Sequence, residues 1–257
     1  VKGGIVIVCK RKRGRIVSYE REKRCIERYI ISKIGARQLE EITAPLAIYI
    51  ARPIENAGKQ STRKHVLMRL REIMDLAVCA GYIEHNPLTR VSKVFAPPKV
   101  TPMPSLHWKH MSEVMDAFKD ANPRLKNFFL FTLCSMLRPG EAAKLEKSWL
   151  CDGVIVIPAS QMKKRREHRV PVTQFMMKLL EQEKTLSPHP KNKFIFSGRK
   201  SNCHISKQSL AKWLHKTSLK NRLVPHGFRS MARVCLAEKG VQFEISESCL
   251  SHCIGDR

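Results

Sequence analysis

A proline-rich segment near the middle of the chain most constrains how the chain can fold. Residues Phe95–Pro104 hold four prolines in ten positions. Proline fixes φ and removes a backbone donor, so this stretch favours a stiff, extended connector. A chain of 257 residues interrupted in this way is expected to fold as two bodies. The expected divisions are 1–18 as a segment of uncertain role, 19–95 as a first domain, 96–105 as the linker and 106–257 as a second domain.

The first domain is predicted to be helical. Its clearest helix covers 61–80, where apolar residues recur along one stripe and Gly81 supplies a stop. A second helix is predicted over 19–33. A third begins at Thr43, with Pro45 tolerated in its first turn. The stripe on the 61–80 helix consists of Val66, Leu67, Leu70, Ile73, Met74, Ala77 and Val78.

The second domain is predicted to combine helices with a small antiparallel sheet. The nearly all-apolar run 124–137 predicts a central buried helix that stops before Pro139. Strands are predicted at 154–157 and 169–172, paired across a basic tip, and at 194–196. Further helices are predicted at 141–147, 174–184, 206–217, 226–239 and 242–250. The expected fold class is therefore mainly α with a small antiparallel β-sheet.

The charge of the chain indicates a polyanionic partner. The formal net charge is +26, with +11 on residues 1–95 and +15 on residues 96–257. A folded body that is basic throughout suits nucleic acid, because each neutralised phosphate releases counterions. No apolar stretch approaches the roughly 20 residues that a membrane-spanning helix needs. The apolar run near Val1 is too short for a signal peptide, so no membrane association is expected.

The cysteines give no sign of a disulfide framework or a metal site. There are nine of them, and no Cys-x-x-Cys pair occurs. Cys249 and Cys253 flank His252, but no second ligand pair stands at zinc-finger spacing. We expect reduced thiols, no structural metal and a cytosolic compartment.

Four short motifs in the second domain carry basic groups suited to a phosphate. In one of them, His226–Arg229, an imidazole and a guanidinium stand at i and i+3 on a predicted helix, so both can reach one phosphate. Taken alone, each motif has an ordinary interpretation: a structural ion pair, a solvated basic turn, a chance His-x-x-Arg or a histidine at a helix end. The motifs are Leu137–Glu141 (LRPGE), Met162–Pro171 (MKKRREHRVP), His226–Arg229 (HGFR) and Leu250–Gly255 (LSHCIG).

Together, the order and spacing of these motifs resemble the tyrosine recombinase (phage integrase) family. Lys163 stands seven residues before the Val-Pro pair that opens the second hairpin strand, as the lysine of that family does. Residues 19–95 are similar to the family's helical core-DNA-binding domain. The segments HGFRSMAR and QMKKRREHRVP most resemble the corresponding motifs of integrases from satellite phages and genomic islands. The resemblance implies that the second domain is the family's mixed α/β catalytic domain.

The resemblance also implies a reaction and a set of catalytic residues. The reaction cuts and rejoins DNA through a 3′-phosphotyrosyl bond, without a metal or another cofactor. Arg138 and Arg229 would bind the non-bridging oxygens of the scissile phosphate. His226 and His252 would add hydrogen bonds and assist proton transfer. Lys163 would protonate the leaving 5′ oxygen.

Further residues are expected to support the site or to bind DNA. Glu141 more plausibly buttresses the pocket than reacts. Arg63 and Lys64 lie in the first turn of a predicted helix, where cations oppose the helix dipole, so a phosphate contact and a solvated helix end are both reasonable. The expected DNA-binding residues are Arg63, Lys64, Lys164, Arg165 and Arg166.

The chain departs from the family pattern in its tyrosines. The family nucleophile follows the last histidine, which places it beyond Arg257. We expect a truncated or incomplete polypeptide whose full form carries this tyrosine and an amino-terminal arm-binding domain. As printed, the chain is expected to bind DNA without cleaving it. All four tyrosines stand in the first domain: Tyr19, Tyr29, Tyr49 and Tyr82.

Two other functions stay open from the sequence. One is a non-catalytic DNA-binding protein or degenerate integrase, which the tyrosine pattern favours. The other is a type IB topoisomerase, which would relax DNA without strand exchange. For a recombinase, the expected partner is a double-stranded attachment site in the cytoplasm of a bacterial host. We expect a tetramer on DNA for the full-length form and a monomer for the printed chain; a DNA-bending host protein is a partner that family members commonly use.

Overall fold

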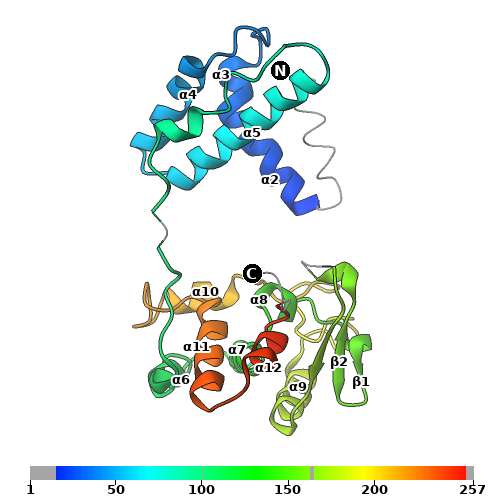
Figure 1. Ribbon diagram of the computed structural model, residues 1–257. Coiled ribbons are helices and arrows are strands. Elements are labelled where there is room, and N and C mark those ends of the chain that lie inside the picture. The colour runs from blue at the N-terminus through cyan, green and yellow to red at the C-terminus, as the bar shows by residue number, and fades with distance from the viewer. Residues whose placement is uncertain (1–15, 100, 163–164, 253–257) are drawn as a thin grey trace. The chain divides into compact units, whose positions relative to one another are not determined.

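The computed structural model describes residues 16–99, 101–162 and 165–252. The chain divides into two compact units, Val1–Thr101 and Pro102–Arg257, which we call the front unit and the back unit. The division falls inside the proline-rich segment, where the chain cannot continue a helix. Figure 1 shows the elements of each unit. Within the described residues, no helix has both the length and the apolar character needed to cross a membrane.

The front unit is helical in its described residues. The predicted helix over 61–80 is confirmed with a shift of one residue, and Gly81, at φ +74°, follows its end. The predicted helix over 19–33 is also confirmed, although its middle turn is a π-helix. The elements are α2 (Ile16–Ile26), the π-helix η1 (Glu27–Ile31), α3 (Ser32–Ile34), α4 (Ala44–Asn56), α5 (Gln60–Cys79) and the 3-10 helix η2 (Val91–Val94).

The apolar stripe of α5 forms one wall of the front core. Helices α4 and α5 pack against each other, and α2 and η2 also contact α5. Pro45 lies in the first turn of α4, as predicted, and Thr43 is its N-cap residue, although the Thr43 side chain makes no capping hydrogen bond. The buried apolar residues of this core include Ile30, Ile50, Ile54, Val66, Leu70, Ile73 and Met74.

The back unit combines helices with a three-stranded antiparallel sheet in the order β1-β2-β3. The mainly α fold with a small antiparallel sheet is therefore confirmed. The helices are α6 (Met111–Ala117), α7 (Pro123–Cys134), α8 (Pro139–Ala142), α9 (Gln174–Leu186), α10 (Ser209–Leu214), α11 (Gly227–Glu238) and α12 (Phe243–Cys249). The strands are β1 (Leu150–Cys151), β2 (Val154–Ile157) and β3 (His168–Pro171), and the 3-10 helices are η3 (Trp108–His110), η4 (Lys147–Trp149) and η5 (Ala159–Gln161).

Helix α7 is the buried centre of the back unit, as its apolar sequence predicts. Phe128, Phe129 and Phe131 are fully buried in it. Helices α9 and α11 contact α7, and the Phe129 and Phe228 rings meet edge to face at 5.1 Å. These aromatic contacts fix α11, which carries two of the candidate site residues, against the core.

Several of the predicted elements differ from the structure. The helix predicted over 206–217 is only the short α10, Ser209–Leu214. The strand at 194–196 is wrong: Phe194 makes only an isolated bridge with Glu146, and Ser197 one with His204. The hairpin strand at 169–172 forms one residue earlier, because His168 pairs with Ile157 at the end of β2. The helix predicted over 141–147 is the short α8, which begins at Pro139, the residue that the sequence analysis treated only as a stop.

Candidate nucleic-acid interface and active site

The start of α11 is held by a close backbone contact. A Cβ atom on Gly227 would lie 2.7 Å from the Pro104 carbonyl oxygen, a distance that side chains do not adopt. The Ser105 hydroxyl also donates to the Gly227 carbonyl at 3.2 Å. Glycine is required here because the segment at 104–105 crosses the first helical turn. This contact fixes where His226 and Arg229 enter the site.

Arg229 is buried, and no carboxylate among the described residues forms an ion pair with it. Only 4% of the residue is exposed. Its Nη2 donates to the Leu250 carbonyl at 2.6 Å, and its Nη1 donates to the Met136 carbonyl. Both carbonyls lie just past helix ends, those of α7 and α12, where the helix dipole is negative. The guanidinium is therefore fixed by backbone oxygens while its charge is not cancelled.

Two left-handed turns present these carbonyls. Met136 has φ +51° after α7, and Ser251 has φ +54° after α12. After α12, the Ser251 N–H bonds to the Ser248 carbonyl at 2.9 Å and the His252 N–H bonds to the Glu247 carbonyl at 3.0 Å. This pattern is the Schellman motif, which closes a helix and reverses the chain. It aims the Leu250 carbonyl at Arg229 and places His252 next to the site.

Arg138 and Glu141 lie beside Arg229. Arg138 is the residue before α8, and its backbone N–H donates to Glu141 Oε2 at 3.1 Å. Its Nη1 donates to Glu141 Oε1 at 2.8 Å. Burial, followed by the charge of Arg138, lowers the pKa of Arg229 to about 10. Of the two guanidinium groups, only that of Arg138 pairs with Glu141, which leaves net positive charge at Arg229.

The two predicted histidines come into the same cluster by different means. Burial, then Arg229, Arg138 and His252, lowers the pKa of His226, whereas Glu141 acts in the opposite direction. His226 is an exposed residue, so burial is the weaker argument for this shift. The cationic neighbours lower the pKa as well, and they support the same direction. The His252 Nδ1 lies 2.7 Å from Glu247 Oε2. The structure therefore brings together Arg138, Glu141, His226, Arg229 and His252.

Three residues of this cluster were missed by the sequence analysis. Glu247 on α12 contacts His252, and Arg233 Nε donates to Glu247 Oε1 at 2.6 Å. His168 on β3 is only 8% exposed, and its Nε2 has no hydrogen-bond partner among the described residues. Burial and the charges of Arg229 and Arg138 lower the pKa of His168, and Glu141 opposes them. A signal for His168 existed, since it stands at an inward position of the predicted hairpin.

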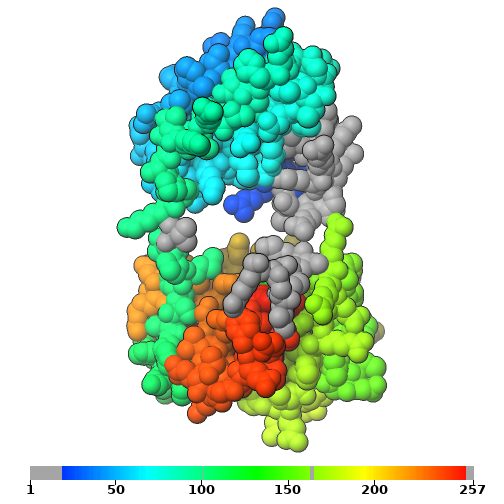
Figure 2. Space-filling view, in the orientation of Figure 1, coloured from blue at the N-terminus to red at the C-terminus, as the bar shows by residue number. Residues whose placement is uncertain are grey.

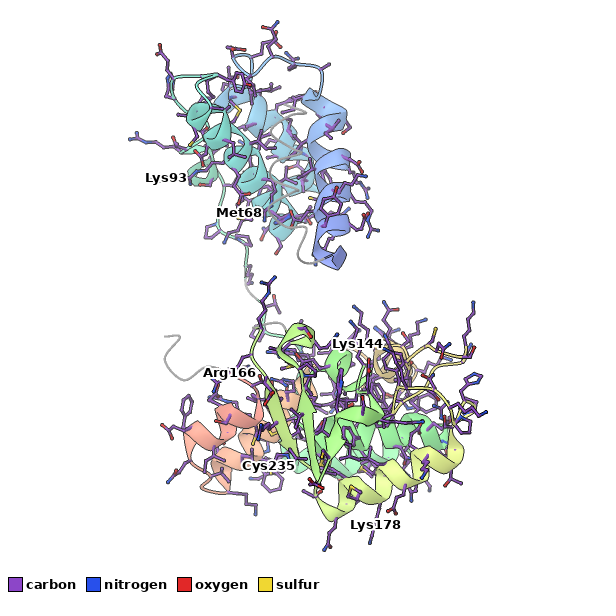
Figure 3. All side chains as sticks on the ribbon, turned by 90° about the vertical axis from the view of Figure 1, so that its right-hand side faces the viewer. Met68, Lys93, Lys144, Arg166, Lys178 and Cys235 are labelled. Atoms are coloured by element: carbon purple, nitrogen blue, oxygen red, sulfur yellow. The ribbon has the colours of Figure 1, made fainter. Side chains whose placement is uncertain are left out.

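The hairpin tip is basic but only partly described. Lys163 and Lys164 lie outside the described residues. Arg165, at φ +53°, and Arg166 are exposed on the described part of the turn. Arg166 borders a hollow of about 450 Å³ that is also lined by Ser248, Ser251, His252 and the residues 167–169. In Figure 3, Arg166 and Lys178 of α9 lie at opposite ends of the back unit.

In the front unit, Arg63 corrects one of the expected DNA contacts. The residue is 2% exposed, its Nη2 donates to the Ala96 carbonyl at 2.8 Å, and its Nε lies 2.7 Å from Glu55 Oε2. That ion pair meets the distance but not the alignment of a hydrogen bond. The Arg63 guanidinium also lies 4.7 Å from the centre of the Phe95 ring. Arg63 is thus held by structural contacts, because Ala96, Glu55 and the Phe95 ring all engage its guanidinium.

Lys64, next to Arg63, stays available for an outside contact. It is exposed and borders a hollow of about 580 Å³. Met68 and Lys93, both labelled in Figure 3, line the same hollow. Lys64 therefore keeps its place as a candidate DNA-binding residue.

Comparisons with known proteins agree with this arrangement. Residues 105–253 match the phage integrase family, and residues 10–94 match the phage integrase central domain. The prophage integrase IntA of Escherichia coli (strain K12) is 31% identical over 238 residues, covering 89% of this chain and 56% of IntA. The integrase of Enterobacteria phage P4 is 23% identical, covering 93% of this chain and 57% of that protein. The chain therefore spans little more than half the length of these relatives.

Solved structures share the fold. A lambda integrase tetramer bound to a Holliday junction matches with a TM-score of 0.78 at 16% identity, covering 100% of this chain and 77% of that one. The Tn1549 transposon integrase in complex with a circular intermediate DNA matches with a TM-score of 0.75 at 13% identity, covering 98% and 92%. The family pattern spans more than half of the chain, including every described residue of the arginine and histidine cluster. The chain therefore belongs to the phage integrase, or tyrosine recombinase, family.

Proposed function

We propose that this chain is the DNA-binding and phosphate-activating part of a site-specific recombinase that cuts and rejoins DNA through a 3′-phosphotyrosyl intermediate. One observation carries the proposal. Arg229 is buried beside Arg138 and contacts two carbonyls, with no carboxylate within ion-pair distance among the described residues. Such a buried cation is costly unless an anion completes the site. A DNA phosphodiester is an anion of the right size and charge.

The proposed chemistry uses this positive charge in the transition state. A tyrosine hydroxyl attacks phosphorus, the bond to the 5′ oxygen breaks, and a 3′-phosphotyrosyl bond forms. Negative charge increases on the non-bridging oxygens, where the planar guanidinium groups of Arg138 and Arg229 match them. His226, whose pKa is lowered, is suited to accept the tyrosine proton. Lys163 is proposed to donate a proton to the leaving 5′ oxygen.

The proposed nucleophile is not one of the tyrosines in the front unit. The four tyrosines of the printed chain all precede the proline-rich segment, and none stands near the arginine and histidine cluster in sequence. We therefore propose that cleavage requires a tyrosine that the printed chain does not carry. The printed chain by itself is expected to bind DNA and to form no covalent adduct.

The proposed partner is a double-stranded attachment site. Support comes from the net charge of +26 and from relatives whose solved structures hold DNA as a dimer or as a tetramer. In the back unit, we propose that Arg165, Arg166 and the hairpin Lys164 contact the DNA backbone. We also propose a tetramer on DNA for the full-length protein, a monomer for the printed chain, action on DNA in a bacterial host, and assistance by a DNA-bending host protein.

Adduct formation tests the catalytic part of the proposal. The printed chain first selects its binding sites from a random duplex library, and the recovered site is then built into a nicked suicide duplex. The full-length polypeptide should form a covalent adduct in the presence of EDTA, whereas the printed chain should form none. Specific binding with no adduct from the full-length polypeptide would favour a non-catalytic DNA-binding protein. An adduct from the printed chain would disprove the requirement for a further tyrosine.

The salt dependence of binding tests the front-unit contact. Each phosphate contact contributes about 0.9 to the slope of log K against log salt concentration. Lys64→Ala should therefore weaken binding and lower that slope by about 0.9. An unchanged slope would assign Lys64 to solvent. Glu84→Ala, which alters an exposed front-unit residue without removing a cation, is the control.

A further inference from the structure

Helices α11 and α12 are joined twice, through residues one turn apart on α11. Arg229 donates to the Leu250 carbonyl, and Arg233 donates to the Glu247 side chain. Residues at i and i+4 lie on the same helix face, so both arginines meet the end of α12 from one side. Figure 2 shows α11 and α12, in orange and red, side by side at the surface of the back unit. Of these two arginines, only Arg229 is assigned to the phosphate in the proposed reaction, which leaves the junction between Arg233 and Glu247 without an assigned function.

The second junction ends on His252. The two oxygens of Glu247 have separate partners: Oε1 accepts from Arg233 Nε at 2.6 Å, and Oε2 lies 2.7 Å from His252 Nδ1. The hydrogen bond with His252 comes first among the causes that lower the pKa of Glu247. An ionised carboxylate accepts hydrogen bonds and donates none, so the proton of this contact must belong to Nδ1. In the neutral imidazole, Nε2 is then the nitrogen without a proton.

The backbone of α12 holds His252 at the same time. The His252 N–H donates to the Glu247 carbonyl at 3.0 Å, as part of the Schellman motif. One residue therefore fixes both the backbone and the ring of His252. The ring borders the hollow of about 450 Å³ that His168 and Arg166 also line, which is large enough for a phosphate group. With Nδ1 engaged, Nε2 is the nitrogen left for a ligand there: it accepts a proton when the ring is neutral and donates to an anion once the ring is protonated.

We propose that Glu247 is the positioning residue for His252: it holds a proton on Nδ1 and so reserves Nε2 for proton transfer at the DNA phosphate, where the protonated ring donates its Nε2–H to a phosphate oxygen, while Arg233 anchors the carboxylate. This inference rests on the proposed function of the site. The role resembles that of the carboxylate that orients a histidine in a hydrolytic triad, where the partner of one ring nitrogen sets the state of the other. An ion pair between Arg233 and Glu247 alone would not require the second oxygen to face a histidine.

The tautomer of His252 provides a test that needs no cleavage. Long-range proton–nitrogen spectra of the printed chain, labelled at histidine, should show His252 as the Nδ1–H form at neutral pH. His252→Asn identifies the signal by its loss. Glu247→Ala should remove this preference and give the Nε2–H form or a mixture. The inference is overturned if wild-type His252 carries its proton on Nε2, or if Glu247→Ala leaves the spectrum of that ring unchanged.

Cleavage by the full-length polypeptide gives the second test. Glu247→Ala should slow single-turnover cleavage by about 10- to 100-fold, by analogy with the loss seen when the outer partner of a metal-binding histidine is removed. DNA binding should stay within about twofold. His252→Ala should be as slow alone as in combination with Glu247→Ala, because residues that act as a unit are not additive. Independent, multiplying effects of the two changes would refute the positioning role.

A second glutamate–histidine pair in the back unit supplies the matched control. The Glu238 Oε1 lies 2.7 Å from His107 Nε2, the same distance as in the Glu247 pair, and among the described residues the hydrogen bonds of this carboxylate go to His107 and Trp108 and not to the arginine and histidine cluster. Glu238→Ala should leave the rate of cleavage and the His252 signal unchanged. If the wild-type full-length polypeptide forms no adduct at all, the proposed function fails. The tautomer measurement on the printed chain still decides the positioning role. If wild-type protein cleaves and Glu247→Ala cleaves equally fast, only the positioning role fails.

Discussion

The two units of this protein treat their buried arginines in opposite ways. In the front unit, Arg63 pairs with Glu55, and Arg69 Nε lies 2.8 Å from Glu22 Oε2 with Glu72 as a second partner. In the back unit, Arg229 is equally buried, but its described contacts are carbonyl oxygens. One of its charged neighbours is another cation, Arg138. Burial is the first cause that lowers the pKa of Arg229, and the charge of Arg138 is the second.

This difference separates a structural cation from a functional one. A fully buried arginine that is paired with a carboxylate has little charge left to offer an outside ligand, whereas Arg138, which also pairs with a carboxylate, is only half-buried and stays accessible to one. A buried arginine held by carbonyl groups keeps its charge and its planar donor fork for an anion. Perturbed titratable groups collect at functional sites for this reason. Burial alone would have placed Arg63 and Arg229 in one class, and only the partners distinguish them.

The two units also differ in which residues adopt left-handed backbone angles. Among the described residues, left-handed φ angles in the front unit occur at Gly58 and Gly81. The back unit also adopts them at residues with side chains, among them Met136 and Ser251, which flank the carbonyls bound by Arg229. A left-handed conformation at a non-glycine residue costs free energy and persists where surrounding contacts require it. The strain therefore lies next to the functional arginine.

The largest expected effect comes from removing the functional cation. In the full-length polypeptide, Arg229→Ala should reduce cleavage of the suicide duplex by about 10³-fold, because it removes donors to the phosphate oxygens in the transition state. DNA binding should fall only slightly, since most contacts lie elsewhere. Arg222→Ala, which removes an exposed ion pair with Glu113, is the control. A loss of binding as large as the loss of cleavage would contradict the assignment of Arg229 to chemistry.

In the absence of DNA, replacing Arg63 should reduce the free energy of unfolding more than replacing Arg229 does. Arg63→Met should destabilise the front unit by about 3–5 kcal/mol, because it leaves the Glu55 carboxylate without its partner. Arg229→Met should cost the back unit less than about 1 kcal/mol, because the lost carbonyl contacts are offset by relief of desolvation and of repulsion from Arg138. Equal costs for the two variants would remove the basis of the comparison.

Urea unfolding can resolve the two units in one chain. All three tryptophans, at positions 108, 149 and 213, lie in the back unit, whereas circular dichroism follows the helices of both. Arg63→Met should shift the dichroism transition and leave the fluorescence transition in place. Lys64→Met, next to Arg63 but exposed, should change stability by no more than about 0.5 kcal/mol and serves as its control.

Acid should affect the back unit through His168. Its folded pKa is lowered, mainly by burial, so the unfolded chain takes up a proton first as the pH falls. The stability contributed by the neutral ring is therefore present above the ordinary value of 6.5 and is lost as the pH falls through the lower folded value. Fluorescence-detected unfolding between pH 7 and pH 5 should show this loss in wild type. His168→Leu should reduce this loss of stability. The other groups that titrate in this range, such as Glu183, whose pKa is raised by burial, are present in both proteins and cancel in the comparison.

The smallest expected effect concerns a left-handed turn beside Arg229. Ser251→Gly should stabilise the back unit by about 0.5–1 kcal/mol, because glycine adopts φ +54° without the Cβ penalty. The fluorescence transition in urea measures this change. The gain should be absent in Ser248→Gly, where the residue is helical and glycine is unfavourable. A destabilised Ser251→Gly variant would indicate that the serine side chain makes a contact of its own.

The local sequence was sufficient for most of the fold. The apolar stripe of α5 and the all-apolar run of α7 predict buried helices because burial of one helix face follows directly from residue spacing. The β-branched run in β2 predicts a strand for the same kind of reason. The error at 194–196 has a physical cause: Ile195 and Phe196 are apolar because they pack in the core, and the segment makes only isolated bridges.

For the candidate site, the sequence identified the residue types and their order, and only the tertiary structure decided their partners. Arg138, His226, Arg229 and His252 could be singled out because short motifs place basic groups at fixed spacing. The same reasoning misassigned Arg63 and missed Glu247, because the charge that reaches a ligand depends on which carboxylates lie within a few ångströms. The carbonyl contacts of Arg229 join segments 93 and 21 residues apart, and the shorter-range pairs Glu55–Arg63 and Glu247–His252 depend on how the chain turns between or after helices, so no local residue pattern records them.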